Sequence, residues 1–274
     1  MTARQAAKTA SILTLALAGA LPLTAQAQGA PDAWKWNATI YGWFPAIGGS
    51  TSFPATGSGP SIDVSAEQVI DALKMAFMGS LEARKGKWGG FTDLVYADFG
   101  ADKSGSRDFT VGHQQIPVGV DAALNLDVKT WIWSVAGLYN LADKPEGTAD
   151  LLFGARLLDM DQTLGWSISG SVPGLPPAAQ TGSATASINQ WDAIAGVKGR
   201  INLGAERKWF LPYYLDVGAG ESKFTWQVAA GIGYQFGWGS VIAAWRYLDY
   251  DFKSDMTVQS FNLNGGMIGV QFGF

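Results

Sequence analysis

The sequence contains no cysteine, which excludes disulfide bonds and thiol chemistry. Its only histidine is His113, and no His, Cys or carboxylate spacing typical of zinc or calcium sites occurs. We therefore expect no metal and no cofactor. With 19 basic and 23 acidic residues and no basic stripe, the chain also lacks the electrostatic pattern of a nucleic-acid-binding protein.

Charged residues are scarce, at 15% of the chain. Even so, the chain has no long apolar run after its N-terminal segment. No segment there reaches the roughly 18 consecutive apolar residues that a transmembrane helix requires. Tryptophan (12) and glycine (35) are abundant. A soluble β-sandwich would tolerate the glycines but should carry more surface charge. Many aromatics and few charges are instead typical of alternating strands that face lipid.

The first 27 residues have the pattern of a secretory signal peptide. Arg4 and Lys8 precede an apolar stretch over residues 10–21, and Ala25-Gln26-Ala27 supplies the small-x-small cleavage pattern. The apolar stretch is too short to span a bilayer. We expect residues 1–27 to be removed on export, which leaves 28–274 as a single domain.

The segment 224–236 shows the clearest strand pattern. Over thirteen residues, large apolar side chains from Phe224 to Phe236 alternate with small or polar ones such as Thr225 and Gln227. This period of two excludes a helix. The length exceeds that of an ordinary globular strand but suits a tilted membrane crossing of roughly 9–11 residues plus its ends.

Similar patterns predict ten strands, an even number as expected of a single-chain bacterial barrel, with eight or twelve as alternatives. The fold class is therefore all-β, a single antiparallel transmembrane β-barrel. The predicted strands are 34–44, 75–84, 89–99, 120–129, 150–157, 190–202, 209–218, 224–236, 239–252 and 259–274.

The predicted connections alternate in length. Short links near 85–88, 141–149, 204–208 and 237–239 alternate with long ones near 45–74, 100–117 and 160–187. Short turns belong on the periplasmic side, where both termini should lie, and long loops belong outside. In the first long loop, Ser65 and Gln68 form a capping-box pattern that predicts one short helix. That helix either closes the barrel mouth or folds inward, or else packs only on its own loop.

The last strand ends on an aromatic residue. Ile268, Val270, Phe272 and Phe274 share one face, and Phe274 is the terminal residue. This ending resembles the assembly signal of outer-membrane barrels. The resemblance implies two partners, outer-membrane lipid and the outer-membrane insertion machinery.

The order of motifs across 28–274 resembles a family of uncharacterised proteobacterial outer-membrane β-barrel proteins, and more distantly small porin-like barrels. The resemblance implies an outer-membrane barrel and no catalytic residue. The matching pieces are Tyr41-Gly42-Trp43-Phe44-Pro45 with Gly48-Gly49, Leu81-Glu82-Ala83-Arg84 with Gly86-Lys87-Trp88-Gly89, Asp93-Leu94-Val95-Tyr96, Gly154-Ala155-Arg156, Gly196-Val197-Lys198 and Trp245-Arg246-Tyr247-Leu248-Asp249.

Charged residues on the faces opposite the apolar ones should line the lumen, because charges are costly against hydrocarbon. These predicted lumen residues are Glu82, Arg84, Asp93, Asp121, Asp127, Lys129, Asp150, Arg156, Asp192, Lys198, Arg200, Asp216 and Arg246. Seven acids and six bases can pair across a narrow barrel and close it. This favours a structural or surface protein with a plugged lumen. The alternative is a narrow, weakly selective channel for small polar solutes.

A third alternative is a lipid-modifying enzyme at the outer rim. It depends on His113 in the loop 100–117, with Ser104, Ser106, Asp102 and Asp108 nearby. No fixed spacing connects these residues into a nucleophile, base and orienting group, and loops are rich in such residues in any case. We therefore expect no enzymatic activity. The sequence leaves the oligomeric state open.

Overall fold

The computed structural model describes residues 33–51, 61–106, 110–111, 114–115, 120–170, 178–254 and 258–274. The predicted signal peptide 1–27 and His113 lie outside these residues. Almost all of the described chain is β-strand, with one helix. None of the helices in this part of the chain is long and apolar enough to cross a membrane.

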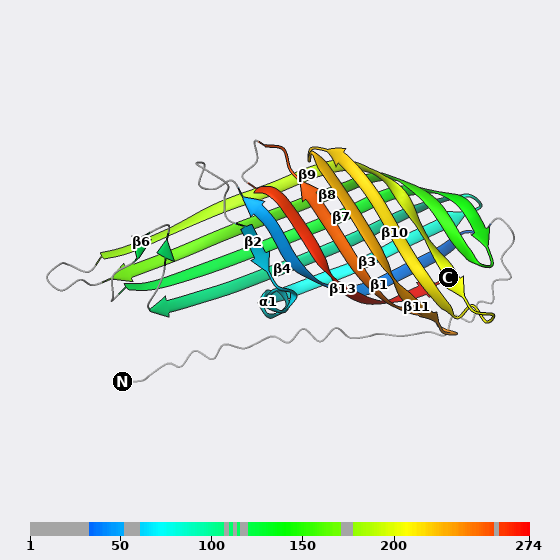
Figure 1. The fold of residues 1–274 in the computed structure, drawn as a ribbon, viewed down its shortest axis with the longest axis horizontal. Helices are drawn as coiled ribbons and strands as arrows, with labels where there is room; N and C mark the ends of the chain where they lie inside the picture. The colour runs from blue at the N-terminus through cyan, green and yellow to red at the C-terminus, as the bar shows by residue number, and fades with distance from the viewer. Residues whose placement is uncertain are drawn as a thin grey trace, which may run out of the picture. The chain divides into compact units, whose positions relative to one another are not determined.

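Ten antiparallel strands form the wall of a barrel, as the sequence predicts (Figure 1). Each strand pairs with the next, and the last pairs with the first. In wall order they are β1 (Lys35–Thr51), β3 (Leu73–Lys85), β4 (Trp88–Ser106), β7 (Val120–Lys144), β8 (Gly147–Gly170), β9 (Ala178–Leu203), β10 (Trp209–Gly220), β11 (Phe224–Gln235), β12 (Ser240–Asp251) and β13 (Val258–Gly273). Short strands β2 (Ser61–Val64), β5 (Thr110–Val111) and β6 (Gln114–Gln115) and helix α1 (Ala66–Ala72) lie in the connections.

The barrel closes along β1 and β13. Their register runs from Asn37↔Gly273 to Ser50↔Ser260. Closure pairs the first and last strands, so the sheet has no terminal edge strand, as a strand-built structure in hydrocarbon requires. The end of the chain takes part in the closure, because the Trp36 and Phe274 backbones exchange two hydrogen bonds of 2.8 and 3.0 Å.

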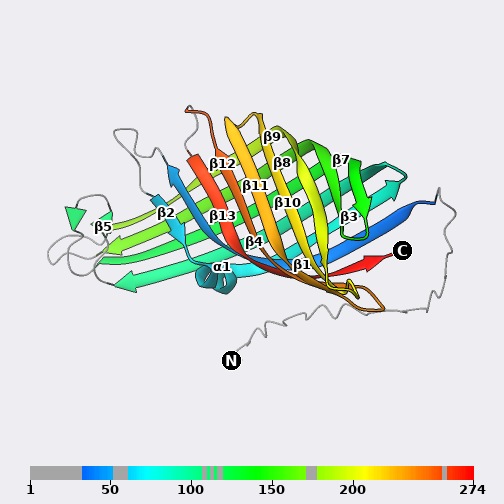
Figure 2. The same ribbon diagram turned by 45° about the vertical axis from the view of Figure 1, so that its right-hand side comes forward.

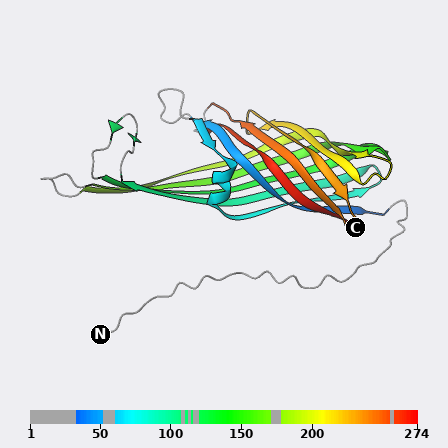
Figure 3. The ribbon, with the colours of Figure 1, turned by 60° about the horizontal axis from the view of Figure 1, so that its bottom comes forward.

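The wall is much taller on one side than on the other. β7, β8 and β9 have 25, 24 and 26 residues, whereas β10, β11 and β12 have 12 each. The long strands, with β4, project well beyond the short ones (Figures 1 and 3). Large parts of the predicted loops 100–117 and 160–187 are therefore strand, and the predicted strand 120–129 is only the first part of β7.

Those predictions were wrong because the sequence signal for a strand weakens beyond the apolar belt. A lipid-facing strand must keep apolar residues at every second position, whereas a projecting strand need not. In the projecting part the strands are joined by long backbone ladders. The β8–β9 ladder, for example, continues from Gly147↔Ile201 to Gly170↔Ala178.

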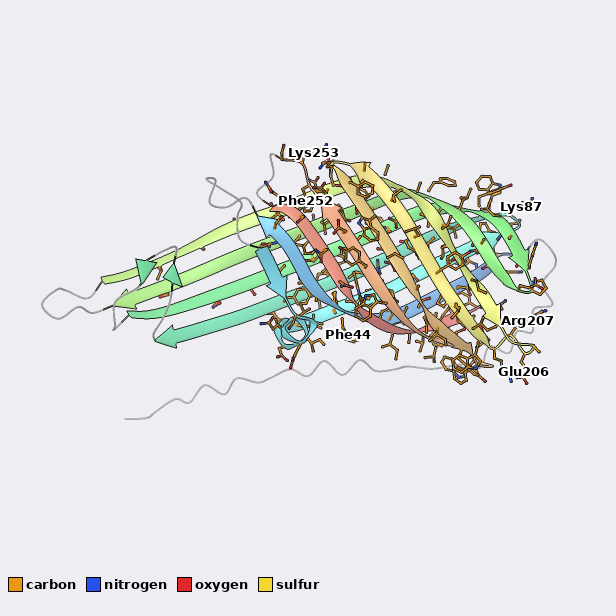
Figure 4. The ribbon with its side chains drawn as sticks, viewed as in Figure 1. Phe44, Lys87, Glu206, Arg207, Phe252 and Lys253 are labelled. Carbon is orange, nitrogen blue, oxygen red and sulfur yellow. The ribbon has the colours of Figure 1, made fainter. Side chains whose placement is uncertain are left out.

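The four predicted short links contain the turns β3–β4, β7–β8, β9–β10 and β11–β12, and these turns lie together at one end of the barrel. Gly86 in the β3–β4 turn and Gly204 in the β9–β10 turn have φ of 60° and 71°, a conformation that favours glycine. Figure 4 shows Lys87, Glu206 and Arg207 at this end. We call it the short-turn end. The short β10–β11 turn (221–223) lies at the opposite end.

Helix α1 begins at the predicted capping box. Ser65 accepts a hydrogen bond from the Gln68 backbone, and the Gln68 side chain accepts one from the Ser65 backbone. The helix packs against β1 and β4, with Val69 buried. Figure 2 shows it beside the wall near these strands. The alternative in which the helix packs only on its own loop is therefore wrong.

The outer surface of the barrel is apolar between two aromatic zones. Near the short-turn end lie Trp88, Trp209 and Trp238, each more than half exposed. Towards the opposite end, ring pairs such as Tyr96–Trp131 (centroids 4.3 Å apart) and Trp226–Tyr247 (4.8 Å) form the second zone. Between the zones, residues such as Ile40, Phe153 and Ile232 are exposed. A soluble monomer rarely exposes so extensive an apolar surface.

Candidate functional site

The middle of the lumen is crossed by a buried arginine. Arg246 on β12 donates to Asp93 on β4 (2.9 Å), to the Tyr41 hydroxyl on β1 (2.8 Å) and to Gln227 on β11 (2.9 Å). Tyr41 in turn donates to Asp93 at 2.7 Å. The guanidinium also lies 4.6 Å from the centre of the Trp43 ring. These contacts connect opposite sides of the barrel through side chains.

A second ion pair lies beside the first. Arg156 on β8 pairs with Asp216 on β10, and both side chains are fully buried. Arg156 also donates to the Ser134 hydroxyl on β7 at 3.1 Å. A buried charge requires such partners, because the loss of hydration is otherwise very costly. We call Tyr41, Asp93, Arg156, Asp216 and Arg246 the central ionic layer.

A further network lies closer to the short-turn end. Arg84 on β3 forms a two-pronged ion pair with Asp150 on β8, with distances of 2.6 and 2.5 Å. Glu82 pairs with both Arg84 and Lys198 on β9, and Asn140 donates to Asp150 at 2.8 Å. We call these five residues the lower network. Like the central ionic layer, it connects opposite sides of the wall.

Most of the predicted lumen charges point inward. The central ionic layer and the lower network bring together Asp93, Arg156, Asp216, Arg246, Glu82, Arg84, Asp150 and Lys198. Arg200 lies 5.1 Å from the Phe210 ring centre. Asp192 is buried elsewhere and accepts hydrogen bonds from the Ser222 backbone (2.9 Å) and hydroxyl (2.7 Å) in the β10–β11 turn.

Two predicted lumen residues face outward instead. Asp127 and Lys129 are exposed and lie on the face of β7 opposite the buried Thr130 and Ile132. This part of β7 lies beyond the second aromatic zone. Here the outer face of the strand can carry charge, and the apolar face points into the barrel. Between the two aromatic zones apolar side chains face out and charges face in, whereas at Asp127 and Lys129 the charges face out. Asp121 lies in β7, but its side chain is outside the described residues.

Two cavities lie on either side of the central ionic layer. The lower cavity, of about 430 Å³, opens among polar side chains that include Glu82, Arg84, Lys198 and Arg200. The upper cavity, of about 290 Å³, is lined by apolar side chains that include Met78, Val95, Ile132, Met160, Ile188 and Leu263.

The order of residues along single strands places the layer between the cavities. On β1, Asn37 lines the lower cavity, Tyr41 belongs to the layer and Trp43 lines the upper cavity. On β8, Arg156 belongs to the layer and Met160 lines the upper cavity. The lumen is therefore divided into two spaces by buried ion pairs.

Several of these residues are absent from the predicted lumen set. Tyr41, Ser134 and Gln227 are uncharged partners of the layer, and a search for charges alone does not find them. The upper cavity was missed for a related reason. Val95 and Ala97 lie two and four residues after Asp93, so the period of two could have placed them inside.

Among the described residues, no group of three or more His, Asp or Glu side chains is placed to hold a metal ion. The carboxylates of the lumen are paired with arginine, lysine or hydroxyl groups instead. These ion pairs and hydrogen bonds join the strands of the wall to one another through the lumen.

No protein-family model and no curated protein matches the sequence. Solved structures that resemble it include the outer membrane protease OmpT from Escherichia coli, with 10% identity, a TM-score of 0.47 and coverage of 89% of this chain and 97% of that one. The translocator domain of the autotransporter NalP from Neisseria meningitidis has 14% identity, a TM-score of 0.41 and 90% coverage of each chain. The attachment invasion locus protein Ail of Yersinia pestis has 10% identity, a TM-score of 0.31 and coverage of 89% and 99%. The similarity to these solved structures does not indicate an activity for this chain.

Proposed function

We propose that the chain is an integral protein of the bacterial outer membrane, with a closed lumen and a structural or surface role. The barrel's apolar belt between two aromatic zones supports the membrane location. The short-turn end faces the periplasm, and the tall wall of β4, β7, β8 and β9 projects outside. This orientation follows the usual arrangement of such barrels, with short periplasmic turns.

The observation that carries the closed lumen is the central ionic layer. Arg246 and Asp93 are 3% and 7% exposed, and Arg156 and Asp216 are both 0% exposed. We therefore expect water and ions to pass between the two cavities only when these pairs separate. A buried charge that loses its partner is strongly disfavoured, so the layer should stay closed at rest.

Planar-bilayer recording of the refolded protein tests the closed lumen directly. We expect no steady conductance over a range of voltages. Steady conductance would refute the closed lumen and favour the narrow channel, for which the polar lower cavity is the supporting observation.

Membrane insertion has a separate test. After fractionation, the protein should be found in the outer membrane and should migrate differently on gels before and after boiling. Deletion of Phe274 should reduce the amount inserted if the insertion machinery reads the last strand. A soluble periplasmic protein with identical migration in both samples would refute the location.

The proposal includes no catalytic activity. The residues of the outer-rim alternative centre on His113, outside the described residues. We expect the variant His113→Ala to leave the lipid composition of the membrane unchanged. A changed composition would support the alternative of a lipid-modifying enzyme.

A further inference from the structure

The barrel wall has a local break between β1 and β3. The two strands pair from Lys35↔Arg84 to Ile40↔Gly79. Beyond this point β1 next pairs on that side with β2, at Ile47. Within the described residues, positions 41–46 of β1 and 73–78 of β3 thus have no ladder between them.

One weak contact bridges the break. The Trp43 backbone N–H donates to the sulfur of Met78 at 3.1 Å, in place of a backbone carbonyl. A thioether is a poor acceptor compared with a carbonyl. The strands are therefore held together less firmly here than at any paired position, where a regular ladder of N–H···O=C bonds joins them.

Helix α1 stands at this break, directly before β3. Its buried Val69 lines the upper cavity, together with Ile70 and Leu73. Ile70 is 48% exposed and Phe44 on β1 is 41% exposed, and both also line the cavity. The cavity therefore reaches the outer surface between Phe44 and α1, on the side of the barrel where Figure 4 shows Phe44.

The upper cavity offers almost nothing to a polar solute. Its polar lining groups are Thr130, Gln162 and the Trp43 indole, and the last two already donate, Gln162 to Met160 sulfur (2.9 Å) and Trp43 to the Gly265 carbonyl (3.2 Å). Its volume of about 290 Å³ is about twice the ~150 Å³ of an apolar cavity that stays dry and binds benzene. The walls fit a hydrocarbon.

We propose that the upper cavity binds one hydrocarbon chain, the acyl tail of a lipid or of a free fatty acid, which enters through the wall between β1 and β3. Helix α1 and the Trp43–Met78 contact form the gate. The central ionic layer closes the cavity from below, so the chain cannot pass on to the periplasm. This inference rests on the proposed membrane location.

Electron paramagnetic resonance with nitroxide-labelled chains provides the test. The full mature protein is refolded into phosphatidylcholine vesicles that contain either phosphatidylcholine or stearic acid, labelled near the end of the chain. We expect a strongly immobilised spectral component in at least one of the two preparations. Immobilisation of the labelled phosphatidylcholine identifies a membrane lipid as the source, and immobilisation of the stearic acid alone identifies a free fatty acid.

A filled cavity separates this component from lipid on the outside of the barrel. Ile132→Trp places bulk in the cavity, whereas Val135→Trp on the outer face of the same strand is the matched control. Loss of the immobilised component in Ile132→Trp, with retention in Val135→Trp, is the expected result. Val95→Phe, a smaller filling change from β4, gives the same test if Ile132→Trp does not fold.

An inserted, heat-modifiable protein whose immobilised component is the same in wild type and filled variants would overturn the inference. Failure of the wild type to insert would instead refute the proposed membrane location. The two failures are therefore distinguishable on the same sample.

Discussion

The central ionic layer and the upper cavity occupy one lumen, but their walls contain different chemistry. The layer contains buried arginines and aspartates whose partners come from other strands: Arg246 on β12 meets Asp93 on β4 across the lumen, and Arg156 on β8 meets Asp216 two strands away on β10. The cavity is lined by aliphatic, methionine and aromatic side chains that need no partner. Charges in a low-dielectric interior must be neutralised by contact, and long arginine side chains therefore fill the space between the walls. Apolar walls carry no such requirement, and space remains between them.

The same strands build both regions. β4 supplies Asp93 to the layer and, two and four residues later, Val95 and Ala97 to the cavity. β12 supplies Arg246, and Leu248 two residues later belongs to the apolar cluster around the cavity. Backbone geometry therefore does not explain why the lumen is filled at the central ionic layer and empty at the upper cavity. The side chains at successive inward positions decide it.

The largest expected change is the opening of the layer. The double variant Asp93→Ala/Arg246→Ala removes both charges and the side chains that span the lumen, so the two cavities should join. We expect the silent wild-type barrel to become steadily conducting in planar bilayers. The control, Lys74→Ala/Asp127→Ala, removes an ion pair on the outside and should stay silent. A silent Asp93→Ala/Arg246→Ala barrel would mean that this ion pair is not what closes the lumen.

The second prediction concerns the free energy of unfolding. Asp216→Ala leaves the fully buried Arg156 without its carboxylate, which should cost about 3–5 kcal/mol. The apolar double variant Arg156→Met/Asp216→Leu should recover most of this loss, because no charge is left buried. Urea titration of the refolded barrel, followed by gel mobility, measures both. Equal losses in the two variants would show that the charge itself is not the cause.

A third prediction compares added bulk in a packed and in a hollow part of the lumen. Ala136 packs with Leu138, Leu152 and Ile194, whereas Ala97 lines the upper cavity, and both are nearly fully buried. Ala136→Leu should cost about 1–3 kcal/mol through overpacking. Ala97→Leu should cost clearly less in the same urea titration. A loss at Ala97 as large as that at Ala136 would argue against an open cavity.

The smallest expected effect is at the exposed pair Lys74–Asp127, whose side chains are 52% and 51% exposed. Asp127→Asn should change the free energy of unfolding by about 0–1 kcal/mol. Any difference should shrink in high salt, since exposed charges are screened. A loss comparable to that of Asp216→Ala would mean that the projecting wall is stabilised by charge.

Much of the barrel could be predicted from local pattern. The ten-strand count, the short turns and the capped helix follow from alternation, turn residues and the Ser65–Gln68 pair, all of which depend on neighbours in sequence. The predicted inward phase agrees with the structure between the two aromatic zones, where the outer face is apolar. It was wrong at Asp127 and Lys129, where β7 has left that zone and the outer face carries charge.

The order of residues alone predicts that apolar and polar positions alternate, that the two faces of each strand differ and that charges of both signs share the inward face. Which charges meet depends on the closed barrel, since Arg246 and Asp93 are 153 positions apart and come together only when the barrel closes. The same is true of the break between β1 and β3 and of the cavity behind it. Each is a relation between strands across the wall or the lumen, and barrel closure and strand register, which set such relations, are not encoded in the spacing of residues along any one strand.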